Sequence, residues 1–177
     1  MNKTKKIVFI SIYVSLALVL DYIKSFIPFL NMASGGSINI ALIPIVLCSF
    51  HLGVTKGALA GLLWWLVSSI LGLNPYYLNI FQYLLDYVIP SFIIGMCSLF
   101  YKKKNIFEIE IGITLMMIIR TLAIIISGAV YWSEASVNSF AAWSVSLIYN
   151  LPYSIATLIM LLIVIPLLIK SLRKVML

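Results

Sequence analysis

Charged residues are scarce in this chain of 177 residues, which has 12 basic residues, 5 acidic residues and a single histidine. Soluble domains carry about 25% charged residues, whereas here 10% are charged and 63% are hydrophobic. This composition excludes a soluble domain and indicates an integral membrane protein. Because a spanning helix needs roughly 20 apolar residues, the chain has room for about six spans and little else.

Other absences narrow the class of function. The cysteines Cys48 and Cys97 lie in apolar segments without a Cys-x-x-Cys spacing or a nearby histidine, so we expect free core thiols and no metal site. No Gly-x-x-x-x-Gly-Lys-Ser/Thr motif occurs, so the chain has no means of binding ATP by that route. We therefore expect no cofactor and no catalytic residue.

The net charge is +7, and most of the basic residues lie in the gaps between apolar segments. This distribution indicates membrane orientation and argues against nucleic acid as a partner. The lysines at the N-terminus precede a long apolar run without a small-residue cleavage site, so we expect a retained helix rather than a signal peptide. We expect an all-α, six-span bundle in a single membrane domain, 1–177, with spans near 7–30, 38–52, 55–73, 76–101, 109–132 and 140–169.

Orientation follows from the connections. Basic residues occupy both termini, position 56 and the segment 102–104, whereas the connections 31–37, 73–76 and 133–139 contain no lysine or arginine. Because basic loops stay on the cytoplasmic side, we expect both termini in the cytoplasm and the uncharged connections outside.

Small residues recur in the expected third span, where Gly53, Gly57 and Gly61 follow one another at four-residue intervals. A helix stripe without side chains lets a neighbouring backbone approach closely, so we expect these glycines to mark a helix–helix contact. Beyond this span, Asn74 and Pro75 have the residue types of a helix N-cap and first turn, and we expect the fourth helix to start there.

One carboxylate, Asp86, lies inside the apolar stretch YYLNIFQYLLDYVIP. On a regular helix it shares a face with Asn79, Tyr83 and Tyr87, because the four recur at three- and four-residue steps. A carboxylate in a span is costly unless it finds a partner or water, so this face should point inward.

Two interpretations of Asp86 remain open. In the first, Asp86 neutralises Arg120, the arginine deep in the fifth expected span, in a structural ion pair. Alternatively, it binds a flat cationic ligand, with tyrosine rings supplying stacking and cation–π contacts.

Further polar and aromatic residues lie near the expected outer ends of the last two spans. Asn150 needs a partner because it is a carboxamide in a span, and Pro152 frees a backbone carbonyl about one turn upstream. We expect Asn150 to bond a neighbouring helix or a ligand. The aromatic residues, which singly are typical interfacial anchors, are Tyr131, Trp132, Trp143 and Tyr149.

Several short motifs together resemble a known family. In chain order they are GGSI at 35–38, IP at 43–44, the run from Tyr76 to Tyr87, R…SG…W from Arg120 to Trp132, and YN at 149–150. Their order, spacing and six-span setting are similar to the thiamin-specific substrate-binding (S) component of energy-coupling factor (ECF) vitamin transporters. The resemblance covers nearly the whole chain. It implies a multi-pass protein of the cell membrane that captures its vitamin from outside and is not an enzyme.

The resemblance also implies roles for single residues. The family's acidic–aromatic pair falls on Asp86 and Tyr87, its stacking tryptophan on Trp132 and its asparagine on Asn150. Tyr83 is a further candidate for contact with the vitamin, from the shared helix face.

The loop before the second span would act as a lid over the pocket. Its residues Gly35, Gly36 and Ser37 permit the backbone conformations that a moving loop needs. An ordinary turn is the alternative.

The chain departs from the family pattern at three positions. Asp86 stands where the family usually has glutamate, Ile124 where it commonly has histidine, and Val145 where it commonly has tyrosine. A ligand group left unpaired in a dry pocket loses about 1–3 kcal/mol. Either thiamin binds with substituted contacts, or the ligand is a related, less polar molecule such as a precursor or another vitamin.

Uphill transport would have to be powered by another protein. The resemblance implies a membrane coupling subunit with two ATPase subunits, and Ser11 and Ser15 form a small-xxx-small step at the position of the family's docking pair. Packing against another span of this chain is the alternative. A membrane enzyme or a self-sufficient carrier has less support, because His51 is the single histidine and no internal repeat is visible.

Overall fold

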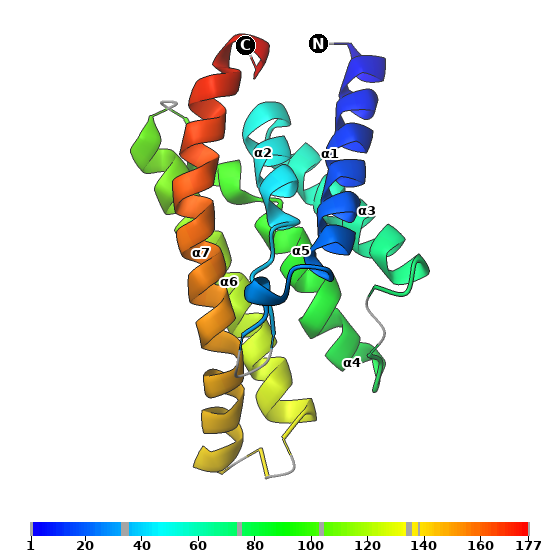
Figure 1. Cartoon of the computed structure of the whole chain (residues 1–177), viewed down its shortest axis with the longest axis vertical. Helices are drawn as coiled ribbons and strands as arrows, with labels where there is room; N and C mark the ends of the chain where they lie inside the picture. The colour runs from blue at the N-terminus through cyan, green and yellow to red at the C-terminus, as the bar shows by residue number, and fades with distance from the viewer. Residues whose placement is uncertain are drawn as a thin grey trace.

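The computed structural model describes residues 2–32, 36–73, 76–102, 105–133, 136–137 and 139–176, with side chains up to residue 172. Within these ranges the chain is helical apart from its connections and one isolated β-bridge, which confirms the all-α class. The start of α1 (Lys3–Lys24) and the end of α7 (Phe140–Met176) lie at the same end of the bundle (Figure 1). The two termini therefore share one side of the molecule.

Four helical stretches of the described residues are long and apolar enough to cross a membrane. They are Lys3–Lys24, Ile80–Phe100, Ile106–Tyr131 and Phe140–Leu172. The apolar helices α2 (Leu42–Leu52) and α3 (Val54–Ile70) are shorter. At 1.5 Å per residue, α2 covers only about 16 Å of a hydrocarbon layer of about 30 Å. Residues 36–41 extend further down the bundle from the first residue of α2, and the 3₁₀ turn η1 (Pro28–Leu30) follows α1 (Figure 1).

Asparagine side chains start three of the helices. Asn2 accepts a hydrogen bond from the backbone N–H of Lys5, and Asn105 caps α6 (Ile106–Tyr131) in the same way. The helix expected to begin at Asn74 begins instead at Ile80, where the Asn79 side chain accepts from the backbone N–H of Gln82 at 2.9 Å. That expectation was therefore wrong about the cap, and Asn74 and Pro75 themselves lie outside the described residues.

The expected fourth span is an interrupted helix. A short α-helix, α4 (Ile80–Tyr83), leads into the π-helical segment η2 (Leu84–Val88), then α5 (Ile89–Ile94) and the 3₁₀ turn η3 (Cys97–Phe100). Pro90 accounts for the wide turn. Its ring would clash with the carbonyl of Asp86 in a regular helix, and it has no N–H to donate to that carbonyl. The N–H of Ile89 instead reaches the carbonyl of Leu84, five residues back.

The glycine stripe packs largely as expected. A Cβ at Gly57 would meet the backbone of Gly95 and Ser49, and one at Gly61 would meet the carbonyl of Ser91. These two glycines bring α3 against the backbone of α5. Gly53 differs from them, because it has φ +88° and joins α2 to α3 without contacting another helix.

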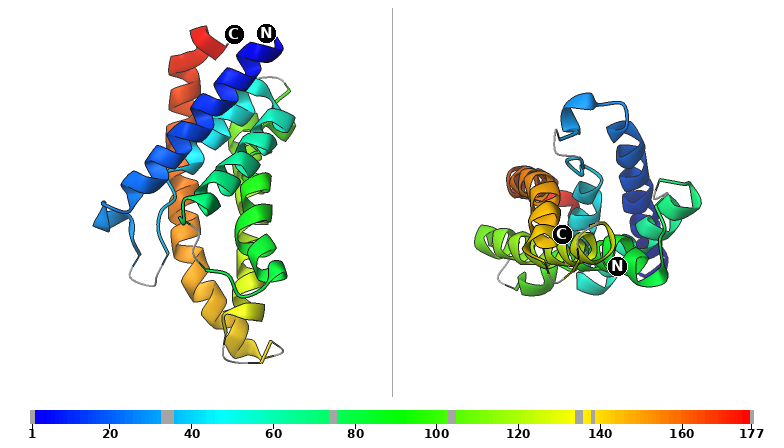
Figure 2. Two further views of the ribbon diagram at one scale, coloured as in Figure 1. Left: turned by 90° about the vertical axis from the view of Figure 1, so that its right-hand side faces the viewer. Right: turned by 90° about the horizontal axis from the view of Figure 1, so that it is seen from below.

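Buried side chains from α1, α2, α3, α5, α6 and α7 form one continuous core, with Cys48 and Cys97 as free thiols inside it. Helices α6 and α7 pack along each other, while α1 runs obliquely across α2 and α3 (Figure 2). The core fills the half of the bundle near the termini. The other half, around the ends of α1 and α3 and the start of α7, contains a cavity.

Candidate ligand-binding pocket

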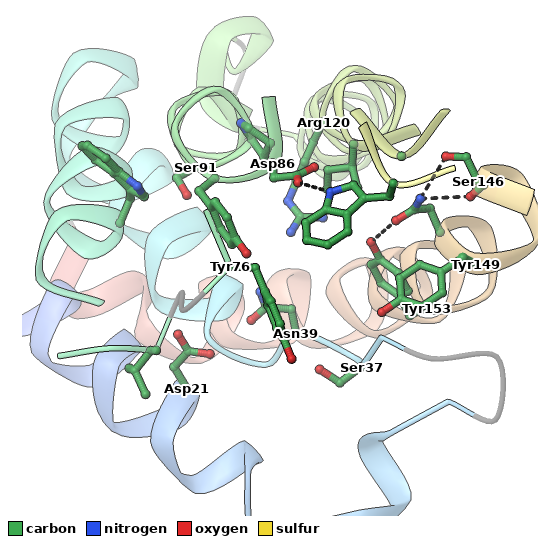
Figure 3. Close-up of a pocket in the computed structure, with 18 of the residues that line it drawn as sticks. Asp21, Ser37, Asn39, Tyr76, Asp86, Ser91, Arg120, Ser146, Tyr149 and Tyr153 are labelled. Carbon is green, nitrogen blue, oxygen red and sulfur yellow. Dashed lines mark hydrogen bonds between the residues drawn. The ribbon is translucent and has the colours of Figure 1, made fainter. Parts of the chain in front are cut away.

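A cavity of about 590 Å³ opens among α1, α3, the η2 segment, α6 and α7. Its size falls in the range of small-molecule sites. Aromatic rings and charged groups reach it from helices far apart in the sequence, as Figure 3 shows. The cavity includes four of the residues named from the family resemblance: Asp86, Tyr87, Trp132 and Asn150.

Asp86 is held by two neutral donors. Its Oδ2 accepts hydrogen bonds from Gln82 Nε2 at 2.6 Å and from Trp132 Nε1 at 2.9 Å. Gln82 is fully buried, and its own oxygen accepts from the backbone N–H of Leu78, which fixes the amide. Both bonds use Oδ2, and no hydrogen bond from the described residues reaches Oδ1, which is therefore available for a ligand.

The ion pair between Asp86 and Arg120 does not form in this structure. Both residues line the cavity, but no ion pair of 4.0 Å or shorter joins them. Since Asp86 is satisfied by Gln82 and Trp132, its role as a counter-ion for Arg120 loses its structural basis.

Two aromatic groups stand beside this carboxylate. The rings of Trp132 and Tyr76 meet edge to face with centroids 6.0 Å apart, and both line the cavity. Tyr87 lines it as well, next to Asp86 in the chain. A flat cation at Asp86 would therefore meet ring faces as well as a negative charge.

Tyr83 lies apart from the cavity. Its hydroxyl donates to Ser69 Oγ at 2.7 Å and its ring contacts Trp65 on α3, so it joins α4 to α3. The expectation of a single polar face assumed a regular helix. The π segment between Tyr83 and Ile89 changes the rotation per residue, which separates Tyr83 from Asp86 although the Tyr83 and Tyr87 rings remain 4.9 Å apart.

Asn150 is buried at the junction of α6 and α7. Its Nδ2 donates to the carbonyl of Ser146 at 2.9 Å, and its Oδ1 accepts from the hydroxyl of Tyr153 at 2.5 Å. Ser146 in turn donates to the carbonyl of Ile125 on α6. Gly128 permits this approach, because a Cβ there would meet the Ser146 hydroxyl. Asn150 thus bonds within its own helix, so the expected bond to a neighbouring helix is wrong, and a contact with a ligand stays a prediction.

The loop before α2 closes one side of the cavity. Ser37 lines the cavity and pairs with Asn31 in the β-bridge, and the backbone N–H of Asn39 donates to Thr157 Oγ1 on α7 at 3.1 Å. Gly36 has φ +72° and packs against the ring of Tyr153, where a side chain has no room. Gly36 thus contacts the cavity wall without lining the cavity itself, and Gly35 lies outside the described residues.

A second carboxylate in the cavity was missed from the sequence. Asp21 on α1 is buried and accepts from Lys24 Nζ at 2.8 Å, and both side chains line the cavity. The signal was present, because Asp21 also lies in an apolar run and precedes a tyrosine, as Asp86 does.

Ile124 and Val145, where the chain departs from the family pattern, also line the cavity. They therefore lie where the resemblance places ligand contacts.

A family model described as thiamine transporter protein (Thia_YuaJ) matches residues 7–177. The chain belongs to the thiamine transporter family. Among relatives of this family, the thiamine transporter ThiT of Bacillus subtilis (strain 168) is 34% identical over 182 residues, covering 95% of this chain and 93% of the relative. A solved structure of ThiT from Listeria monocytogenes shares the fold, with a TM-score of 0.82 over 98% of both chains at 22% identity.

Membership of the thiamine transporter family, together with the long apolar helices, makes this chain a multi-pass protein of the cell membrane. The helices expose many large apolar side chains, as expected of lipid-facing surfaces; examples are Ile7, Val19, Ile118 and Ile163. The cavity has the opposite character, since two carboxylates and two cations line it.

Proposed function

We propose that this chain is the substrate-binding component of an ECF-type importer and that thiamin binds in the cavity beside Asp86. The observation that carries the proposal is the environment of this carboxylate. Gln82 and Trp132 anchor one oxygen, while the other accepts no hydrogen bond from the described residues and lies in a ring-lined cavity. The family membership supports the same ligand.

The chemistry of thiamin fits these groups. Its thiazolium ring is a flat cation, which is attracted by a carboxylate and by aromatic faces. We assign the cation to Asp86 and Tyr87, and ring stacking to Trp132. Asn150 would hold its side of the cavity in shape, since its amide is already bonded within α7. Tyr83 supports these residues through its ring contact with Tyr87 rather than by touching the vitamin.

The loop with Gly36 and Ser37 is proposed as the lid. In its support, Ser37 lines the cavity, and the described part of the loop lies against α7 through the backbone N–H of Asn39 and the contact of Gly36 with the ring of Tyr153. A vitamin in the cavity would give Ser37 a further contact and so favour the closed position.

The proposed coupling surface lies on α1. Ser11 and Ser15 are both exposed, and Ser11 Oγ donates to the carbonyl of Ile7 within its own helix. The inner stripe of α1, which contains Ile10, Val14 and Ala17, packs on the rest of the chain instead. The serines are therefore free for close docking of a membrane coupling subunit, which would work with two ATPase subunits. We assign the termini to the cytoplasm and the cavity to the outer side, in line with the basic loops.

Titration of the purified protein with thiamin tests the proposal. Tryptophans 64, 65 and 132 line the cavity, so intrinsic fluorescence should report binding, with riboflavin as the control vitamin. In vesicles that contain this chain alone, we expect binding without accumulation of thiamin. Accumulation by the chain alone would identify a secondary carrier, and binding of a pyrimidine or thiazole precursor in preference to thiamin would change the assigned vitamin.

A further inference from the structure

Arg120 is the charged residue of the cavity that makes no hydrogen bond or ion pair with the described residues. It lies in the middle of α6, is 8% exposed and lines the cavity, and Figure 3 shows it among the side chains that reach this space. Its Nε is buried without a hydrogen-bond acceptor, and no hydrogen bond or ion pair joins Arg120 to the part of the chain that the structure describes. Neither carboxylate of the cavity pairs with it, because Asp86 accepts from Gln82 and Trp132 and Asp21 accepts from Lys24.

An unpaired guanidinium in this position is energetically unfavourable. Arginine stays charged at neutral pH, and a charge removed from water without a counter-ion destabilises the folded chain. A structural arginine would relieve this by donating to carbonyls or carboxylates of neighbouring helices, and here none of the described ones accepts from it. The guanidinium thus offers its donors to the cavity.

Other hydrogen-bond donors in the cavity wall also lack acceptors. The indole Nε1 atoms of Trp64 and Trp65 are also buried without acceptors, and both residues line the cavity. A wall with unpaired donors favours a ligand that brings acceptors, because each buried donor without a partner reduces affinity. The thiazolium ring of the proposed vitamin satisfies Asp86 but supplies no negative charge.

The net charge of the cavity also favours an anionic group. Without a ligand, the two carboxylates of the cavity, Asp21 and Asp86, equal its two cations, Lys24 and Arg120, in number, although none of them pairs directly with Arg120. A cation alone would leave one positive charge without compensation in a space of low dielectric constant. An anion that entered with the cation would restore the balance.

We propose that Arg120 forms an anion subsite, which takes a small negatively charged group alongside the cation at Asp86. This inference rests on the proposed function, since it assigns the cation to thiamin. The group is a free inorganic anion such as chloride or phosphate, or a phosphate carried by the vitamin itself. Either would accept charge-assisted hydrogen bonds from the guanidinium.

The experiment compares anions at equal ionic strength. Thiamin is titrated into the purified protein in sodium chloride, in sodium gluconate and in gluconate with added inorganic phosphate, and the monophosphate ester of thiamin is titrated in gluconate. A free anion predicts that thiamin binds at least about tenfold more tightly with chloride or phosphate present, equal to about 1.4 kcal/mol. A covalent phosphate predicts the same gain for the ester in gluconate alone.

Two substitutions assign the effect. Arg120→Gln should abolish the anion preference, whereas Arg120→Lys should keep part of it because the charge remains. Retention of the preference in Arg120→Gln, or its loss in Lys24→Gln, would overturn the assignment to Arg120.

Measurements on the wild-type protein alone distinguish a failure of the anion subsite from a failure of thiamin binding. Equal thiamin affinity in all anions, with no preference for the ester, would refute the anion subsite while leaving thiamin binding established. Absence of thiamin binding under every condition would refute the proposed function itself.

Discussion

Replacement of Asp86 by asparagine should weaken thiamin binding far more than it weakens folding. The substitution keeps the shape of the side chain and leaves an oxygen that accepts from Gln82 or Trp132, as Oδ2 does now. It removes the negative charge and places an N–H₂ donor where a cation is expected. The effect should therefore fall on the ligand.

The magnitude follows from the position of the carboxylate. Two unit charges about 4 Å apart interact by about 4 kcal/mol at an effective dielectric constant of about 20. Asp86 is half-buried in an open cavity, which allows some screening by water, so we expect a loss of about 2–4 kcal/mol. This corresponds to a roughly 30-fold to 1,000-fold weaker affinity.

The assay is fluorescence titration of thiamin, with thermal unfolding of the ligand-free protein measured in parallel. Glu110→Gln, which also neutralises one carboxylate but lies outside the cavity, is the control and should bind normally. The unfolding temperature of Asp86→Asn should stay close to that of the wild type, since no ion pair to Arg120 is lost. Normal affinity in Asp86→Asn, or a large drop in its unfolding temperature without ligand, would refute this reasoning.

Three further predictions concern other links of the structure. Ser15→Trp should leave thiamin binding intact and abolish uptake in vesicles with the coupling subunit and ATPases, because a bulky ring prevents close docking; normal uptake would exclude this surface. Gly57→Leu should lower stability by at least about 1–3 kcal/mol in thermal or denaturant unfolding, because its side chain would meet the backbone of Gly95; an unchanged transition would show that the helices can separate there. Trp132→Phe keeps a ring but removes the donor to the carboxylate, so affinity should fall by roughly tenfold, and Trp132→Ala should fall further; equal values for the two would argue against stacking.

Composition and spacing alone determined the class of protein. An apolar chain with few charges must satisfy its backbone within helices, so the all-α membrane bundle follows from hydropathy. The contacts of Gly57 and Gly61 were predictable because small residues four positions apart lie on one face of a helix. Such a face lets the backbone of a neighbouring helix approach closely. The importance of Asp86 followed from the cost of burying a carboxylate among apolar residues.

Tertiary structure alone decided what each polar group faces. Asp86 could have paired with Arg120 as far as the sequence was concerned, and only the fold places Gln82 and Trp132 at its oxygen instead. Tyr83 left the predicted face because Pro90 forces a π turn, a local change that rotates every residue before it relative to those after it. Asp21 on α1 lines the same cavity as Asp86. The two residues are far apart in the sequence, and helix periodicity relates only residues of the same helix. Residue spacing fixes which side chains share one helix face, whereas the contacts between helices depend on how those faces pack. That packing leaves Arg120 without a hydrogen bond or ion pair to any residue that the structure describes.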